Sequence, residues 1–223
     1  MQIAPFLKLG RGVTALIGGG GKTTLLLTLA RELSARGRVI VAASAKMYPP
    51  PGIPLIAEDD AERVREALRT ERVVCVGTPC AEGKLTAPAL PFSALASLAD
   101  FVLAEADGSR GLPFKAHAPH EPVIPPEAQR VVLVVGADGF GRPIAEVCHR
   151  SARYAALAGA DESACVTPEL AARVLRAEGL GDRIFVNKVE SAERYEAAAR
   201  LAELLGCPVT AGSLKLGVYE CLR

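Results

Sequence analysis

The sequence is poor in aromatic residues: Phe, Tyr and Trp make up 4% of its 223 residues, and Trp is absent. No apolar run reaches the roughly 18 residues that a membrane-spanning helix needs, so we expect no membrane span. The first twelve residues lack the apolar core of a signal peptide, and we therefore expect a cytoplasmic protein. Basic and acidic residues balance, 26 against 25, and no basic run stands out. Nucleic acid is therefore not expected as a partner.

Cysteines at metal-binding spacing are also missing. The six cysteines form neither a C-x-x-C pair nor a zinc-ligand pattern. Thiols stay reduced in a cytoplasmic chain, and several of these cysteines lie in apolar runs, so they are predicted to be small core residues. They are Cys75, Cys80, Cys148, Cys165, Cys207 and Cys221.

The chain contains a regular alternation of short apolar runs and amphipathic stretches. This alternation predicts an α/β fold of three layers, with helices covering both faces of a mostly parallel sheet. No linker or repeat is visible, so residues 1–223 are predicted to form a single domain. The predicted strands are Arg38–Ser44, Val73–Gly77, Phe101–Ala104, Val131–Val135, Arg183–Val189 and Pro208–Ala211. The predicted helices are Thr24–Ala35, Asp59–Thr70, Ser93–Ala99, Ser151–Leu157, Pro168–Ala177 and Ala192–Leu205, with a short hairpin within Thr78–Pro91.

The most informative stretch joins a strand to a helix through four consecutive glycines. A lysine, two threonines and an apolar helix follow the glycines. Glycine amides and a helix N-terminus can surround phosphate oxygens, the lysine adds positive charge, and the next hydroxyl can bind Mg²⁺. Leu16 occupies the position of the first glycine in the G-x-x-x-x-G-K-[ST] pattern, so the turn is predicted at Gly18. The predicted phosphate-binding residues are Gly18, Gly19, Gly20, Gly21, Lys22, Thr23 and Thr24.

A second group of polar residues follows the predicted strand Phe101–Ala104 in the sequence EADGS. Ligands of open α/β sheets bind at the carboxyl ends of the strands, and a phosphate loop needs a nearby acid to hold Mg²⁺. We expect Glu105, with Thr23, to hold this metal, although Asp107 is the alternative ligand. Asp107 is also expected, with Lys22, to assist attack on a terminal phosphate, and the N–H of Gly108 to contact that phosphate.

The next segment, 112–126, contains five prolines and therefore cannot be a helix or a central strand. Long ordered loops in compact domains are often functional, so this segment is a candidate lid. The arginine just before this segment and the charged and titratable residues within it are candidates for binding an anionic substrate or a partner. These candidates are Arg110, Lys115, His117, His120 and Glu121.

A third group follows the strand predicted at residues 183–189. Asn187, Lys188 and Glu190 are similar to the N-K-x-D motif with which GTP-binding proteins read a purine base, with Glu in place of Asp. A carboxylate one methylene longer must be repositioned to accept the same hydrogen bonds. The motif therefore predicts base recognition and leaves ATP and GTP as alternative ligands.

These segments together resemble the YqeC-like family over roughly residues 16–190. The resemblance rests on IGGGGKTTLL, LAEADGSRGLPFKAHAPHEPVIP, VVGADGFGRPI with Cys148-His149-Arg150, and FVNKVE. It implies a P-loop nucleoside-triphosphate-binding fold of the MinD-like and metallochaperone GTPase branch. It also implies an accessory role in maturing a selenium-dependent molybdenum hydroxylase or its cofactor. The Thr-Lys-Met segment of the family is Ala45-Lys46-Met47 here, so Lys46 is kept as a candidate contact to substrate or partner.

The leading hypothesis is a slow nucleotide hydrolase that uses Mg²⁺ and ATP or GTP and serves a molybdenum hydroxylase or its cofactor. One alternative is an ATP-dependent phosphotransferase or ligase of small molecules, similar to dethiobiotin synthetase. Another is a nucleotide sensor that does not hydrolyse its ligand. P-loop proteins of this branch often dimerise across the phosphates, so a homodimer is a further expectation.

Overall fold

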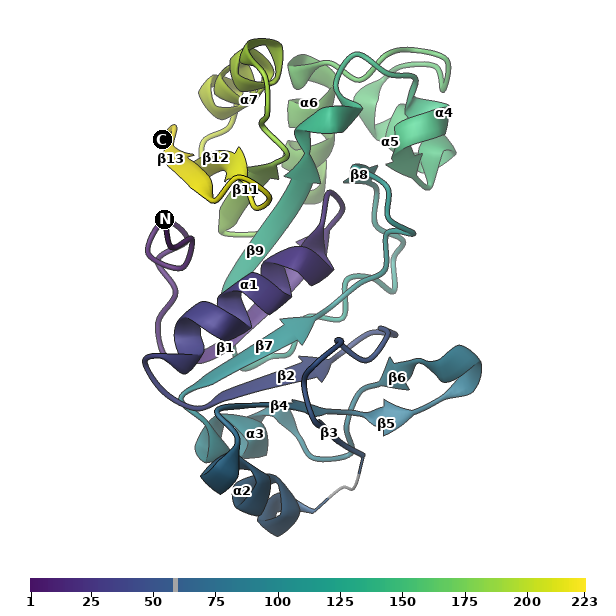
Figure 1. Cartoon of the computed structure of the whole chain (residues 1–223). Coiled ribbons are helices and arrows are strands. Elements are labelled where there is room, and N and C mark those ends of the chain that lie inside the picture. The colour runs from purple at the N-terminus through teal and green to yellow at the C-terminus, as the bar shows by residue number, and fades with distance from the viewer. Residues whose placement is uncertain (58–59) are drawn as a thin grey trace.

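A computed structural model describes residues 1–57 and 60–223, and its central feature is a nine-stranded sheet (Figure 1). The strand order is β13-β12-β11-β9-β1-β7-β2-β4-β3. All neighbours are parallel except β12 and β13, which are antiparallel. The strands are β1 Gly12–Gly18, β2 Val39–Ala43, β3 Leu55–Ile56, β4 Val73–Val76, β7 Phe101–Glu105, β9 Ala128–Gly136, β11 Arg183–Asn187, β12 Val209–Ser213 and β13 Val218–Cys221.

Helices cover both faces of the sheet. Helix α1 (Lys22–Ser34) lies on one face together with the first residues of the chain, and the other helices pack on the opposite face (Figure 1). These are α2 (Ala61–Thr70), α3 (Phe92–Leu98), α5 (Ser151–Ala158), α6 (Pro168–Glu178) and α7 (Ala192–Leu204), with the single turn α4 (Ile144–Val147) beside them. The predicted three-layer α/β class is therefore confirmed.

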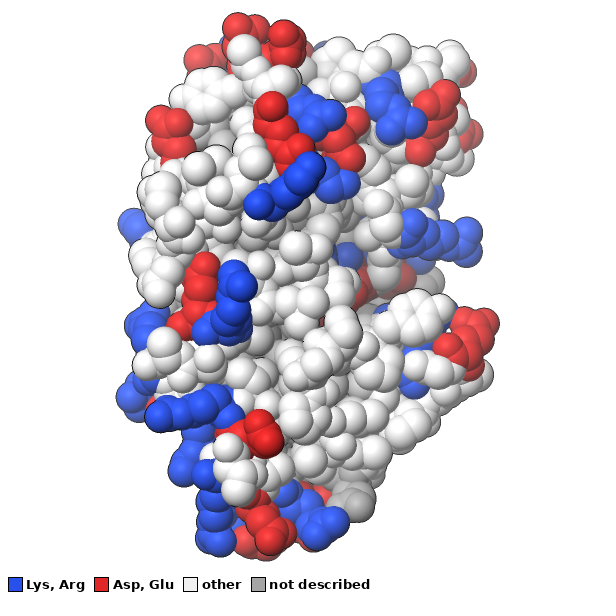
Figure 2. Space-filling model, in the orientation of Figure 1, with Lys and Arg blue, Asp and Glu red and all other residues white. Residues whose placement is uncertain are grey.

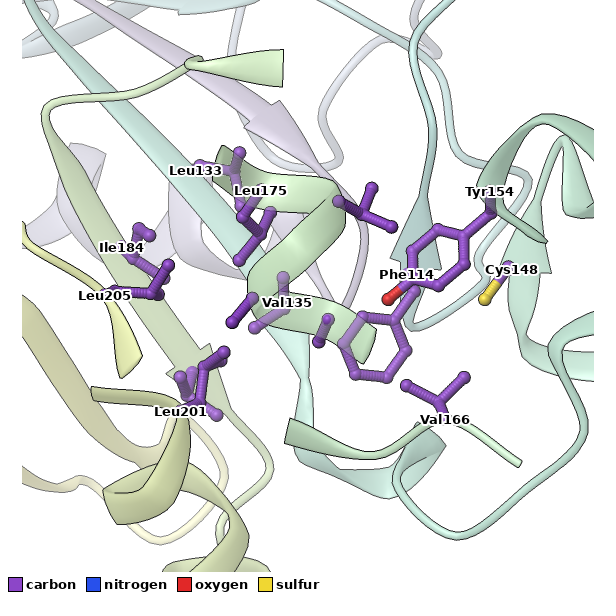
Figure 3. Packing of buried hydrophobic residues seen from close by; sticks show 14 of the residues in the cluster. Phe114, Leu133, Val135, Cys148, Tyr154, Val166, Leu175, Ile184, Leu201 and Leu205 are labelled. Carbon is purple, nitrogen blue, oxygen red and sulfur yellow. The ribbon is translucent and has the colours of Figure 1, made fainter. Parts of the chain in front are cut away.

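The central strands are apolar over most of their length because both faces of the sheet are covered. In β9, Val132 and Val134 face helix α1, whereas Leu133 and Val135 point into the cluster formed with α5, α6 and α7. Figure 3 shows Leu133 and Val135 beside Leu175 of α6 in this second cluster. Because successive side chains of a strand alternate between faces, one continuous run of valine and leucine supplies two cores.

The sheet order brings the loop after β1 between two other strand ends. Strand β1 pairs with β7 on one side and with β9 on the other, and Leu16 lies opposite Glu105. The carboxyl ends of β1, β7, β9 and β11 therefore meet at one edge, which is where parallel α/β sheets bind ligands. In the described part of the chain, no helix is long and apolar enough to cross a membrane.

The long predicted elements agree with the structure within a few residues, whereas several short elements have no counterpart in the prediction. Helix α1 begins at Lys22 rather than at Thr24, and β9 is longer than the predicted Val131–Val135. Residue 59, predicted to start the second helix, lies outside the described residues. The hairpin predicted within residues 78–91 is present as β5 (Thr78–Pro79) and β6 (Leu85–Thr86). The unpredicted β3, α4 and β13 are too short to show a periodicity.

The proline-rich segment is more buried than its prediction as a loop implies. Phe114 and Lys115 form strand β8, which pairs in parallel with β10 (Cys148–His149). The Phe114 ring is 5.1 Å from the Phe140 ring and 6.1 Å from the Tyr154 ring, and Figure 3 shows it inside the core beside Cys148. Burial of this one aromatic ring fixes the segment against the helices, so it cannot be a wholly solvated lid.

The glycine loop packs so closely that one methyl group would disrupt it. A Cβ on Gly20 would lie 2.2 Å from the Gly136 nitrogen, at a φ of +66°. We expect Gly20→Ala to lower the free energy of unfolding by at least about 2 kcal/mol, because strain and a backbone clash add together. Gly108→Ala is the matched control, since a Cβ there meets nothing within 4 Å. Equal denaturant midpoints for the two variants would contradict this packing.

Candidate functional site

The first three glycine amides of the loop bind the protein itself. Gly18 donates to Asp107 Oδ2 at 2.9 Å, Gly19 to the Val134 carbonyl at 2.8 Å, and Gly20 to the Leu112 carbonyl at 3.0 Å. In this arrangement the three amides are already occupied, so they do not offer the phosphate contacts expected from the sequence. They instead fix the loop against strands β7 and β9 and against the start of the proline-rich segment.

The next four amides, those of residues 21–24, lie at the N-terminus of α1. Within residues 1–57 and 60–223 they have no hydrogen-bond partner, and the Gly21 carbonyl accepts the first bond of the helix. Gly21 has a φ of +113°, which turns the chain into the helix without a side-chain cap. Four unused N–H groups and the positive end of a 13-residue helix form an anion site.

Lys22 is buried beside this anion site. Its Nζ lies 2.5 Å from the Gly18 carbonyl oxygen, 3.0 Å from Asp107 Oδ1 and 3.5 Å from Ser109 Oγ. The side chain therefore folds back over the loop and keeps its charge next to the free amides. A phosphate bound at those amides would gain the attraction of a poorly solvated cation.

Asp107 is fully buried and connects the loop to three cations. Besides the Gly18 amide and Lys22, it contacts Lys115 Nζ at 3.2 Å and His117 Nε2 at 2.7 Å through Oδ2. Burial favours the neutral acid, but the His117 hydrogen bond, the two lysine charges and the Gly18 N–H outweigh it, so the pKa of Asp107 is held at about 2. Asp107 is weakly basic and already binds the Gly18 amide and three cationic side chains. These contacts favour a positioning role over the catalytic role that the sequence suggested.

His117 lies between two carboxylates. Its Nε2 faces Asp107 at 2.7 Å and its Nδ1 faces Glu178 Oε2 at 2.8 Å, while its backbone N–H donates to Glu178 Oε1 at 2.6 Å. Burial opposes the charged ring, yet the two carboxylates raise the pKa of His117. Both ring nitrogens then donate, which requires an imidazolium. His117 is thus not free to bind substrate, and Glu178 at the end of α6 is a residue that sequence reasoning missed, because nothing at positions 170–180 marks it.

Glu105 and Thr23 lie where a metal ligand pair is expected. The Thr23 hydroxyl is 3.4 Å from Glu105 Oε2, and Glu105 is buried at the end of β7. Burial raises the pKa of Glu105 and outweighs the nearby Lys22 charge. The carboxylate is therefore short of positive charge. A buried carboxylate and a hydroxyl are hard oxygen donors of the kind that Mg²⁺ prefers.

The three residues of the N-K-x-D-like segment are all held by other loops. Asn187 donates to the Gly20 carbonyl at 2.8 Å and accepts from the Leu214 amide at 3.1 Å, so its amide links the phosphate loop to the turn after β12. Lys188 Nζ is 2.7 Å from Asp138 Oδ2, and Glu190 Oε1 accepts from the Ser213 hydroxyl at 2.9 Å. These contacts hold the Asn187 side chain against the phosphate loop and give it a structural role.

The remaining candidates separate into buried and exposed groups. Lys115 is fully buried and contacts the Gly108 carbonyl at 2.7 Å and Glu121 Oε2 at 2.7 Å. Glu121 is also 3.1 Å from Arg150 NH2, a contact that sequence spacing could not show. Lys46, Arg110 and His120 are exposed. The structure thus connects Lys115 and Glu121 to Asp107 beside the loop, whereas Lys46, Arg110 and His120 lie at the surface.

A strand, a glycine loop and a helix N-terminus, with an acid on the neighbouring strand, define an α/β protein with a phosphate-binding loop. A family model described as "YqeC protein" matches residues 14–152. YqeC of Escherichia coli (strain K12) is 30% identical over 210 residues, which cover 86% of this chain and 82% of that protein. The chain belongs to the YqeC family.

Among solved structures, signal recognition particle 54 kDa protein from Aeropyrum pernix K1, in complex with GDP, is 17% identical with a TM-score of 0.44. The match covers 96% of this chain and 44% of that one. At this level of similarity, the fold rests on the chain's own sheet order and not on this likeness.

The His117 bridge predicts a pH dependence of stability. Because the folded protein raises the pKa of His117 above 6.5, the bridge stabilises the fold fully below that pH and less as pH rises through the folded pKa. We expect the wild-type free energy of unfolding to fall as pH rises above about 6.5, and His117→Gln to flatten this fall. Denaturant unfolding at several pH values measures both. His120→Gln, at an exposed position, is the control and should keep the wild-type slope. An unchanged slope in His117→Gln would refute the bridge.

Proposed function

We propose that this protein binds a nucleoside triphosphate at the loop formed by residues 18–24. The observation that carries this proposal is the group of four amides, residues 21–24, which find no hydrogen-bond partner in the described part of the chain and lie beside the buried ammonium of Lys22. Phosphate oxygens would accept from these amides, and Lys22 would leave the Gly18 carbonyl and reach the terminal phosphates. Asp107 would keep the loop in place while this exchange happens, because it also binds the Gly18 amide.

Mg²⁺ fits the pair Thr23 and Glu105. Their oxygens lie 3.4 Å apart, and the buried Glu105 carboxylate lacks a cation that fully compensates its burial. When bound, Mg²⁺ would neutralise charge on the phosphates. The chain's own part is to hold Thr23 at the start of α1 and Glu105 at the end of β7, which the pairing of β1 with β7 ensures.

Base recognition would fall to Lys188 and Glu190, while Asn187 supports them. The Asn187 amide ties the phosphate loop to the turn that carries Ser213 and Leu214. A base between this turn and Lys188 would meet the Glu190 carboxylate at its edge. The Ser213 hydroxyl already donates to one oxygen of the Glu190 carboxylate, so that oxygen is not free to select guanine. The proposal therefore includes both ATP and GTP as ligands.

We further propose slow hydrolysis of the nucleotide in the service of a client. The family resemblance supports a client among selenium-dependent molybdenum hydroxylases or their cofactors, and a homodimer across the phosphates belongs to the same proposal. A direct coupling path supports such a role: the Asp107–His117–Glu178 chain connects the loop to helix α6. Movement of Lys22 toward a phosphate would remove a positive charge from the neighbourhood of Asp107. This would change the strength of the Asp107–His117–Glu178 contacts that hold helix α6.

Lys22→Ala tests nucleotide binding. Among the described residues, Lys22 carries the only ammonium that contacts both the loop and Asp107. Its loss should weaken the affinity for Mg-ATP or Mg-GTP about a hundredfold or more. Isothermal titration calorimetry measures the affinity. Arg69→Ala removes an exposed cation from the last turn of α2 and should leave the affinity unchanged. Equal affinity of Lys22→Ala and wild type for both nucleotides would rule out the proposal.

Glu190→Asp tests base recognition. Aspartate is one methylene shorter, so its carboxylate would lie farther from Ser213 and would have the side-chain length found in the N-K-x-D motif. We therefore expect the ratio of GTP affinity to ATP affinity to rise. The same substitution at Glu193, in the first turn of α7, is the matched control. Identical ratios in Glu190→Asp and Glu193→Asp would show that Glu190 does not read the base.

A further inference from the structure

Two arginines beside the phosphate loop have backbone conformations that arginine rarely adopts. Arg110 has a φ of 53° and Arg150 a φ of 61°. The left-handed region costs a non-glycine residue about 1 kcal/mol or more, and such residues gather at binding sites. Neither arginine was needed to explain how the loop holds phosphates or metal.

The two arginines come from distant segments, and the charges of both act on His149 in β10. Arg110 follows Ser109, whose hydroxyl is 3.5 Å from Lys22 Nζ. Arg150 follows His149, which lies opposite Lys115 in the register of β10 and β8. Lys115 in turn contacts the Gly108 carbonyl at 2.7 Å. This strand pair therefore places His149 and Arg150 next to the residues 108–110 that follow β7.

Positive charge exceeds negative charge in this cluster. Glu121 is shared by Lys115 at 2.7 Å and Arg150 at 3.1 Å. Lys115 also contacts Asp107 at 3.2 Å, but that carboxylate is shared with Lys22 and His117. The Nε of Arg150 is buried and has no hydrogen-bond partner among the described residues. Arg110 has no ion-pair partner in residues 1–57 and 60–223.

The pKa of His149 is lowered in this cluster. Its burial and the charges of Lys115, Arg150 and Arg110 lower the pKa of His149, and only Glu121 acts in the opposite direction. A neutral imidazole among cations can donate or accept one hydrogen bond without adding charge. Figure 2 shows a hollow at the right-hand edge of the molecule, with basic side chains on its upper rim and charged side chains inside.

We propose that Arg110, His149 and Arg150 form a second anion site next to the phosphate loop. The site would take the phosphate or carboxylate group of a small second ligand, bound together with the nucleotide. Guanidinium groups suit both anions because they present paired N–H donors in a plane. The placement beside a terminal phosphate rests on the proposed function, whereas the site itself rests on the β8–β10 cluster.

The test is calorimetry on the full chain in two stages. A non-hydrolysable ATP or GTP analogue with Mg²⁺ is first titrated to saturation, which blocks the loop, and inorganic phosphate or succinate is then titrated. Wild type should bind one further anion, and Arg110→Gln and Arg150→Gln should each weaken this binding about tenfold without changing the nucleotide affinity. Arg142→Gln, which breaks an exposed pair with Glu146, is the control and should behave as wild type. Preference for phosphate or succinate identifies the group that the ligand carries.

Failure of the second site can be told apart from failure of nucleotide binding. In Lys22→Ala, which should not bind nucleotide, phosphate or succinate should still bind, and Arg110→Gln added to it should weaken that binding. Arg110→Gln also carries the test if Arg150→Gln does not fold, because Arg110 is exposed. The proposal is overturned if wild type binds neither phosphate nor succinate, with or without the nucleotide analogue. It is also overturned if the arginine variants bind these anions as tightly as wild type does.

Discussion

The carboxylate of Asp107 is the interaction on which the site depends. A buried charge is costly unless cations and hydrogen-bond donors surround it, and Asp107 is surrounded by Lys22, Lys115, His117 and the Gly18 amide. Each of these contacts also fixes something else. Lys22 is kept over the glycine loop, Lys115 holds the turn after β7, and His117 reaches helix α6 through Glu178. Because all share one carboxylate, a change at any of them alters the charge balance of the others.

This arrangement divides the loop into a supporting part and a binding part. The amides of Gly18, Gly19 and Gly20 attach the loop to three neighbouring segments, whereas residues 21–24 present theirs at the start of α1. Close packing explains why the supporting part is glycine: a Cβ on Gly18, Gly19 or Gly20 would lie within 2.5 Å of backbone atoms. The missing glycine at position 16 is then no defect, since Leu16 is a buried core residue of β1. The binding part needs only the turn at Gly21 and the helix that follows.

The proline-rich segment contributes to the site from inside the core. Phe114 anchors it among aromatic rings, and β8 pairs with β10, so Lys115 and His149 become neighbours although they are far apart in sequence. The same anchoring gives Leu112 and Pro113 carbonyls that accept from Gly20 and Gly136. The segment is therefore held both to the phosphate loop and to β10, which His149 ends and Arg150 follows. Firmly held surroundings of this kind are suited to orienting two ligands side by side.

The sequence alone determined the parallel α/β class, the long elements and the phosphate loop, because apolar periodicity and a glycine-lysine-threonine run are local signals. It also placed Glu105 near Thr23, since strand ends of a parallel sheet share one edge. Only the tertiary structure decided which groups are charged, buried or already engaged. There, Asp107 binds three cationic side chains, Asn187 links two loops, Glu178 binds His117, and Arg150 binds Glu121. Such roles depend on contacts between segments far apart in the chain, and burial and pairing of a charge leave no local pattern in the sequence.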